Sequence, residues 1–158
     1  MATSASISQT GVLLVDEEVV VRAGLRLLIN SWPTLHVIAE ADTPAEALST
    51  MAALRPNLIV CSYTRASAGF LDDLRVVVEQ ADEIPVVLLT SSRYPQASTM
   101  ALQAGVNCVI SKKRTAFELR ETLEQLRTRR NGAAKNNRGS PSTPVGGGGP
   151  ARRIKAGM

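Results

Sequence analysis

Five short apolar runs alternate with five segments of helical periodicity, and this alternation limits the possible folds more than any other feature of the chain. The runs cover residues 11–16, 35–39, 57–62, 84–90 and 107–111. Three of them are continuously apolar, which is typical of strands that helices cover on both faces. Between the runs the apolar spacing becomes helical, and Val21, Leu25 and Leu28 fall on one face. The sequence therefore predicts a (βα)5 chain with a parallel sheet.

Helix boundaries are marked by capping signals. A capping box with a first-turn proline is formed by Thr43, Pro44 and Glu46. A second capping box is formed by Thr115 and Glu118. A helix stop of the glycine type is indicated by Ala104-Gly105. With right-handed crossovers such a chain forms a doubly wound, five-stranded parallel sheet in a three-layer α/β/α sandwich of the flavodoxin-like type. Ligands of this fold bind at the carboxyl ends of the strands.

The chain of 158 residues is long enough for one domain. We expect a flexible N-terminus over residues 1–10, a domain over 11–130 and a disordered tail or linker over 131–158, which is rich in Gly, Pro and Ser. The net charge of +4 comes from this tail, because residues 1–130 hold 13 basic and 14 acidic side chains and the tail holds five basic and no acidic ones.

Several functional classes find no support in the sequence. The N-terminus lacks the features of a signal peptide and no stretch is long and apolar enough for a membrane span, so we expect a cytoplasmic protein without membrane contact. Cys61 and Cys108 lie in separate apolar runs and are interpreted as core thiols, and His36 as a strand residue. Without a Gly-rich phosphate loop or a Ser/His or Cys/His pair, no enzyme is predicted.

Polar side chains follow four of the five apolar runs and define what we call the carboxyl-end site: Asp16, Glu17, Ser62, Thr90 and Lys112. Carboxylates are the oxygen ligands that Mg²⁺ prefers, while hydroxyl and ammonium groups donate hydrogen bonds to a phosphate-like anion. This spacing alone indicates a cation and anion site only weakly.

Four stretches make the indication specific. LLVDEEVVVRAGLRLLI, EALSTMAALRPNLIVCS and PVVLLTSS with ALQAGVNCVISK resemble, in order and spacing, the receiver domain of LuxR/FixJ-type bacterial response regulators. The resemblance covers nearly all of residues 11–127 and implies a CheY-like fold. It assigns Asp16 and Glu17 to the metal-binding acidic pair, Thr90 to the hydroxyl that engages the phosphoryl group, and Lys112 to the lysine that contacts it.

The sequence departs from the family at Ser62, where the resemblance places the phosphate-accepting aspartate. The family's following Met-Pro-Gly-x-Asp-Gly stretch is here RASAGF, over residues 65–70, and Val109 stands where an aromatic switch residue is common. An unactivated hydroxyl is a poor nucleophile at neutral pH. Replacing the charged aspartate by an uncharged serine also removes a Mg²⁺ ligand. Ordinary aspartyl phosphotransfer is therefore not expected, and no cofactor is required.

Two interpretations of the retained residues stay open. Asp16 and Glu17 either form a weak Mg²⁺ site or only favour the start of the first helix through their charge. Lys112 either contacts an anion or pairs with Asp16 without any ligand.

The leading functional hypothesis is an atypical receiver, a pseudo-receiver, that acts in two-component signalling and transcription regulation through protein partners or a homodimer. The alternative is the N-terminal regulatory part of a helix-turn-helix DNA-binding regulator, or weak nucleic-acid binding by the basic tail. DNA is a partner only if such a domain lies beyond this chain.

Overall fold

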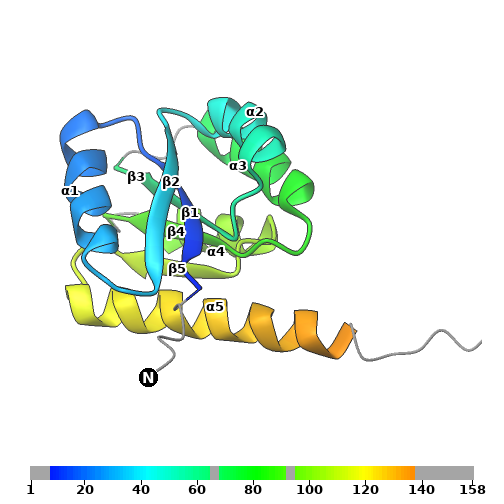
Figure 1. The fold of residues 1–158 in the computed structure, drawn as a ribbon. Helices are drawn as coiled ribbons and strands as arrows, with labels where there is room; N and C mark the ends of the chain where they lie inside the picture. The colour runs from blue at the N-terminus through cyan, green and yellow to red at the C-terminus, as the bar shows by residue number, and fades with distance from the viewer. Residues whose placement is uncertain (1–7, 65–67, 92–94, 138–158) are drawn as a thin grey trace, which may run out of the picture.

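The computed structural model describes residues 8–64, 68–91 and 95–137 and shows the predicted alternation of strands and helices (Figure 1). The five strands are β1 (Thr10–Val15), β2 (Leu35–Ala41), β3 (Leu58–Tyr63), β4 (Val86–Thr90) and β5 (Cys108–Ser111). The five helices are α1 (Val19–Asn30), α2 (Pro44–Leu54), α3 (Ala68–Ala81), α4 (Pro95–Gln103) and α5 (Ala116–Asn137). All strand pairs are parallel and the order is β2-β1-β3-β4-β5. The (βα)5 flavodoxin-like prediction is confirmed.

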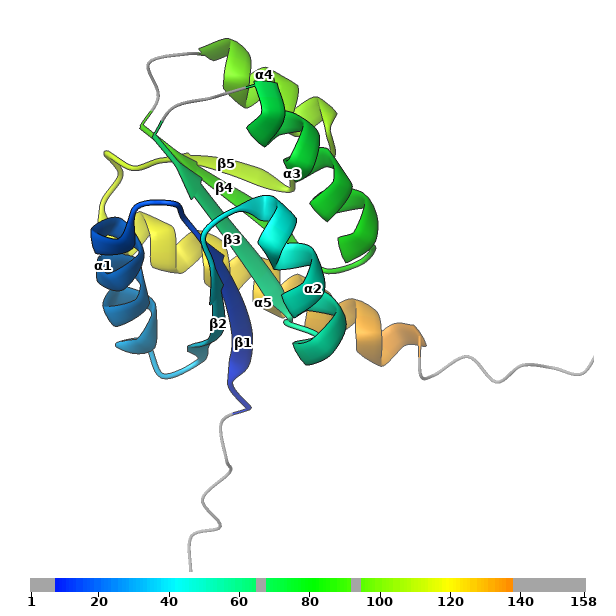
Figure 2. The same cartoon turned by 90° about the horizontal axis from the view of Figure 1, so that it is seen from above.

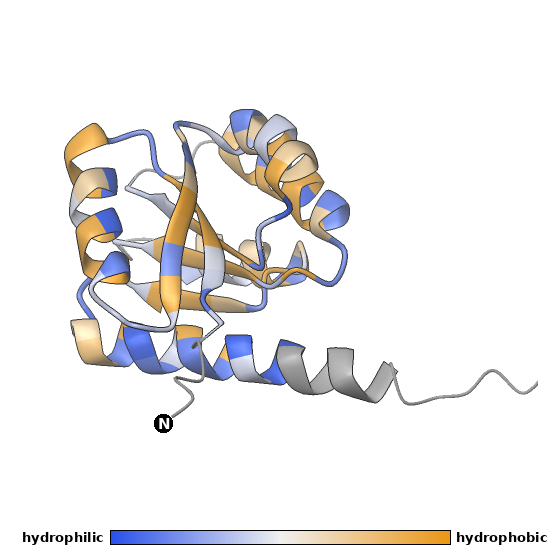
Figure 3. Cartoon of the chain, in the orientation of Figure 1, coloured by the Kyte–Doolittle hydropathy of each residue, from blue (hydrophilic) through white to orange (hydrophobic). Residues whose placement is uncertain are grey.

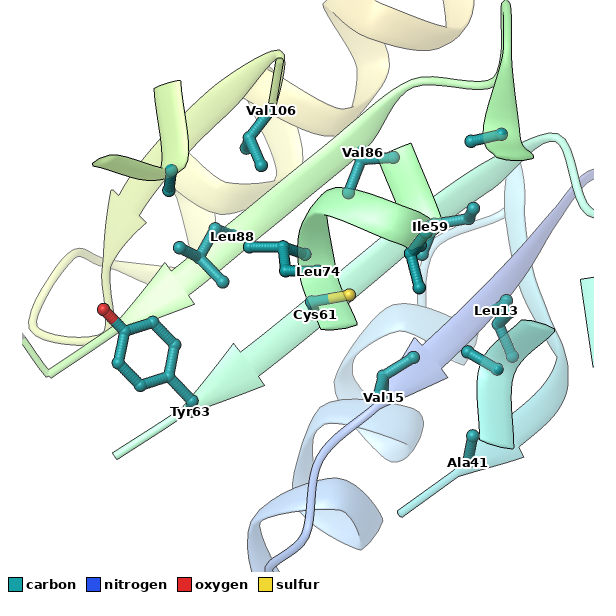
Figure 4. Packing of buried hydrophobic residues seen from close by; sticks show 14 of the residues in the cluster. Leu13, Val15, Ala41, Ile59, Cys61, Tyr63, Leu74, Val86, Leu88 and Val106 are labelled. Carbon is teal, nitrogen blue, oxygen red and sulfur yellow. The ribbon is translucent and has the colours of Figure 1, made fainter. Parts of the chain in front are cut away.

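The sheet forms the middle layer, with α1 and α5 on one face and α2, α3 and α4 on the other (Figure 2). Strand residues alternate between two apolar clusters because successive side chains point to opposite faces. Leu14 and Val60 pack in the cluster that includes Ile29 of α1 and Leu123 of α5. Residues of the other parity pack under α2 and α3, and Figure 4 shows this second cluster, in which Leu13, Val15, Ile59, Cys61 and Tyr63 are members.

The predicted boundary signals have the expected geometry. Thr43 Oγ1 accepts the Glu46 backbone N–H, and Thr115 Oγ1 accepts that of Glu118. The Glu118 carboxylate in turn accepts the Thr115 backbone N–H at 2.9 Å, which completes the capping box. Gly105 has φ of +102°, which only glycine adopts without strain.

The last helix extends past the predicted end of the domain at residue 130, since α5 continues to Asn137. Ala133, Ala134 and Lys135 favour helix, and the first proline after them is Pro141. Strand β1 begins at Thr10, so this residue belongs to the sheet and not to the predicted flexible N-terminus. The remainder of that segment through residue 7, and residues 138–158 of the predicted tail, lie outside the described residues.

Apolar residues dominate the strands, whereas the described side chains of α5 are mostly hydrophilic (Figure 3). The apolar exceptions in α5 are Ala116 and Phe117 at its start and the inner stripe of Leu119, Leu123 and Leu126. Among the described residues, no helix has both the length and the apolar character needed to cross a membrane.

Candidate functional site

Strand register places Asp16 beside Ser62. Val15 of β1 pairs with Cys61 of β3, so the next residue on each strand, Asp16 and Ser62, reaches the carboxyl edge together. Both are only 1% exposed. They share the parity of Leu14 and Val60 and therefore point to the sheet face covered by α1 and α5.

The Asp16 carboxylate has two roles. Its Oδ1 accepts the backbone N–H of Glu18 at 2.7 Å, directly before α1. Its Oδ2 lies 3.8 Å from the Lys112 ammonium and has no hydrogen-bond partner among the described residues. The carboxylate thus contacts both the start of the first helix and the Lys112 ammonium.

The Ser62 hydroxyl is buried and makes no hydrogen bond with the part of the chain that the structure describes. Leaving a buried hydroxyl without a partner costs about 1–3 kcal/mol. Asp16 Oδ2 and Tyr63 Oη also lack a hydrogen-bond partner among the described residues, although Asp16 Oδ2 lies 3.8 Å from the Lys112 ammonium. Buried polar groups without a partner are rare in folded proteins, and a role in function is one explanation for them.

Thr64 connects this edge, although sequence reasoning did not single it out. Its hydroxyl accepts a hydrogen bond from Lys112 Nζ at 3.3 Å and donates one to the Glu18 carboxylate. Its carbonyl accepts the Ser91 hydroxyl at 3.2 Å. The loops that follow β1, β3, β4 and β5 are therefore linked through one residue. Its position two residues after Ser62, just past a strand end, is the only signal that was available.

The two residues of the predicted acidic pair have different surroundings. Asp16 is buried, whereas Glu17 is exposed, and it is Glu18 that reaches Thr64. Among the described residues no group of three or more His, Cys, Asp or Glu side chains is placed to hold a metal. With one buried carboxylate and an ammonium beside it, the site fits Mg²⁺ poorly.

Thr90 and Lys112 occupy the predicted edge. Thr90 ends β4, is 6% exposed and accepts the Lys112 backbone N–H at 2.7 Å through its carbonyl. Thr90 also borders a groove of about 530 Å³ between α4, β5 and α5. Val109, at the position where the resemblance places an aromatic switch residue, lines the same groove.

The other residues considered lie apart from this edge or have buried surroundings. Burial raises the pKa of the Cys61 thiol to about 12 and also raises the pKa of half-buried Cys108. His36 is exposed on β2. Residues 65–67 of the altered loop lie outside the described residues.

With this geometry established, comparison with known proteins decides the family. The family model for the response regulator receiver domain matches residues 12–124. The chain belongs to the receiver domain family of response regulators. It is thus a receiver domain of two-component signalling, as the resemblance implied.

The proteins to which this receiver domain is similar differ in kind. The DNA-binding transcriptional activator DevR/DosR of Mycobacterium tuberculosis is 29% identical over 115 residues, which are 73% of this chain and 53% of that protein. A protein-glutamate methylesterase/protein-glutamine glutaminase of Cereibacter sphaeroides is 33% identical over 71% of this chain and 31% of its own length. The receiver domain therefore spans about half or less of these two relatives.

Solved structures agree on the fold. A LuxR-family two-component response regulator from Aurantimonas sp. SI85-9A1 is 25% identical with a TM-score of 0.69, covering 77% of this chain and 86% of that one. The response regulator domain of Thermotoga maritima CheB is 23% identical with a TM-score of 0.63, covering 78% and 97%.

Proposed function

We propose that this receiver domain transmits signals through protein contacts, without aspartyl phosphorylation. The observation that carries the proposal is the buried Ser62 hydroxyl, in register with Asp16, at the position where the family resemblance places the phosphate acceptor. A hydroxyl needs a base to become a nucleophile at neutral pH. The only carboxylate in register with Ser62, that of Asp16, already binds the Glu18 N–H and pairs with Lys112.

The loop network supports the same function. In phosphate-dependent switching, a bound phosphoryl group would attract the lysine and the hydroxyl and so draw the loops together. Here Lys112, Thr64 and Glu18 join the loops through contacts within the chain. A domain that is held in one arrangement suits constitutive binding of a protein partner, whether a signalling protein or a second copy. We propose no enzymatic activity and no required cofactor for this domain.

A second candidate function is the regulatory part of a DNA-binding protein. It is favoured by the matched relative DevR/DosR, a DNA-binding transcriptional activator of which this chain spans 53%. In that case the receiver would control a DNA-binding domain, and DNA contact would belong to that domain. Sequencing the gene and transcript around this coding region tests the alternative directly, because a helix-turn-helix domain in the same reading frame would establish it.

Phosphodonor chemistry tests the main proposal. The full chain is incubated with acetyl phosphate and Mg²⁺ and its intact mass is measured at neutral and at acidic pH, with a phosphorylatable receiver domain as the positive control. We expect no phosphoryl adduct on Ser62 while the control is modified. A stoichiometric adduct on Ser62 would overturn the proposal.

A further inference from the structure

A hollow of about 450 Å³ opens between α2 and α3, which lie side by side on the sheet face opposite α1 and α5 (Figure 2). Helix α2 ends at Leu54 just before β3, and α3 ends at Ala81 just before β4. The hollow therefore lies near the amino ends of the strands, at the edge of the sheet opposite the carboxyl-end site. It has no part in the phosphoacceptor chemistry discussed above.

Most of the lining is apolar and continuous with the core. Met51 is a core residue that is 7% exposed, and Leu48 and Ile84 pack against the same cluster. Val76 forms part of the lining while remaining 41% exposed to solvent, and Ala52 offers only a methyl group. An apolar group placed here would remove this surface from water, which is favourable by about 25 cal/mol per Å².

The polar part of the lining is Arg55 and Gln80. Arg55 caps the end of α2 in a left-handed conformation with φ of 47°, where glycine or asparagine is the usual choice. Its guanidinium is exposed and forms no ion pair or hydrogen bond within residues 8–64, 68–91 and 95–137, which is also true of the exposed Arg75 of α3. An unpaired cation thus stands at an apolar hollow, although the backbone geometry there does not favour arginine.

Three acidic residues lie close to Gln80 in the sequence. Glu79, Asp82 and Glu83 surround the end of α3, and none of them is among the residues that line the hollow. Gln80 instead contributes an amide, which donates hydrogen bonds without a charge. The donors at the hollow, a guanidinium and an amide, match the two oxygens of a carboxylate.

We propose that this hollow is a binding site for a small amphiphilic anion, an apolar chain or ring that carries one carboxylate. The apolar part lies against Met51, Ala52 and Val76, and the carboxylate binds Arg55 with support from Gln80. The volume lies within the range of about 300–1,000 Å³ typical of small-molecule sites. Ligand binding would extend the core between α2 and α3 and stabilise the folded domain.

Three probes, each built on an eight-carbon chain, test both parts of this assignment: octanoate, 1-octanol and octyltrimethylammonium. Each is titrated into the ¹⁵N-labelled full chain, and amide shifts are followed by NMR. With octanoate we expect saturable shifts at Ala52, Gln80 and Ile84. We expect 1-octanol to bind about tenfold more weakly, because a charge-assisted hydrogen bond contributes about 1.5–3 kcal/mol. We expect octyltrimethylammonium not to bind. No saturable shift at these residues, or equal affinity for octanoate and the cation, would overturn the site.

Variants separate the charge from the cavity. Arg55→Gln should reduce octanoate binding to the level of 1-octanol, whereas Arg75→Gln, which changes an exposed arginine of α3 outside the lining, should leave it unchanged. Ala52→Phe should fill the hollow and abolish binding of both probes. Octanoate binding that survives Arg55→Gln undiminished would overturn the carboxylate assignment. Since the phosphodonor experiment uses none of these residues, either proposal can fail without the other.

Discussion

Ser62 presents a hydroxyl among partners that suit a carboxylate. Asp16 lies opposite it in register, and Lys112 is 3.8 Å from Asp16 Oδ2. The Lys112 ammonium offsets the charge of the Asp16 carboxylate, while Glu17 and Glu18 are exposed nearby. We expect the absent carboxylate at position 62, rather than a change in the fold, to limit what this site binds.

Restoring that carboxylate should restore metal binding. We expect Ser62→Asp to raise Mg²⁺ affinity by at least about tenfold, since one added unit charge at about 4 Å contributes more than the 1.4 kcal/mol that tenfold requires. Isothermal titration calorimetry measures the change. Ser62→Asn has the same shape without the charge and should bind Mg²⁺ no better than the unmodified chain. If the aspartate variant is equally weak, Ser62 does not face the site.

Lys112 is expected to stabilise the fold through Asp16. Lys112→Met keeps most of the side-chain bulk but leaves a 1% exposed carboxylate without its counter-ion, which should lower the free energy of unfolding by about 1–2 kcal/mol. Urea unfolding measures the loss. In an Asp16→Asn background the same substitution should cost much less, because the carboxylate is already neutral. Equal losses in both backgrounds would show that the pair contributes nothing.

The two thiols should differ in reactivity. Burial raises the pKa of Cys61 to about 12 and also raises the pKa of half-buried Cys108, so both remain protonated near pH 8, and the thiolate is the reactive form. We expect iodoacetamide to modify Cys108 slowly, at a rate that increases with pH, and Cys61 only after unfolding. Peptide mass spectrometry identifies the site. Rapid modification of Cys61 in the folded chain would contradict its burial.

At the scale of elements, glycine positions show how helix ends are set. Gly105 follows α4 with φ of +102°, and a Cβ there would lie 2.9 Å from a methyl carbon of Val78 in α3. Gly24 lies inside α1, where a Cβ would meet nothing within 4 Å. The same substitution therefore has opposite expected effects at the two sites.

Gly105→Ala should destabilise the domain by more than about 1 kcal/mol, since both the backbone conformation and the space oppose a side chain. Gly24→Ala is the matched control and should stabilise it by about 0.5–1 kcal/mol, because alanine is the better residue inside a helix. Thermal unfolding of the two variants beside the unmodified chain compares them. A Gly105→Ala variant as stable as Gly24→Ala would contradict the described helix end.

At the scale of the whole molecule, four loops meet at the carboxyl edge and are joined by Thr64, Lys112 and Glu18. All of these contacts are made within the chain. Under the proposed function, we expect the surfaces available for association not to depend on phosphate.

Self-association should accordingly be indifferent to a phosphodonor. We expect a monomer–dimer equilibrium whose dissociation constant is the same with and without acetyl phosphate and Mg²⁺. Sedimentation velocity over a range of protein concentrations measures it, with a phosphorylatable receiver domain as the control that does respond. A dimer that forms only with the donor would contradict a phosphate-independent function.

The sequence by itself determined the order of strands and helices and the membership of most of the site. Continuous apolar runs define buried strands, and capping residues such as Thr43 and Thr115 act locally, so both can be interpreted without neighbours in space. Asp16, Ser62, Thr90 and Lys112 follow strands, and parallel topology brings strand ends to one edge.

Only the tertiary structure decided how these residues are used. Glu17 and Glu18 are adjacent in sequence, but the start of α1 turns the first to solvent and the second toward Thr64. Thr64 acquires its role from partners that are 46 and 48 residues away, which no local pattern encodes. The hollow beside Arg55 likewise exists only because α2 and α3 pack side by side. Local chemistry specifies the elements, whereas contacts between distant segments specify the sites.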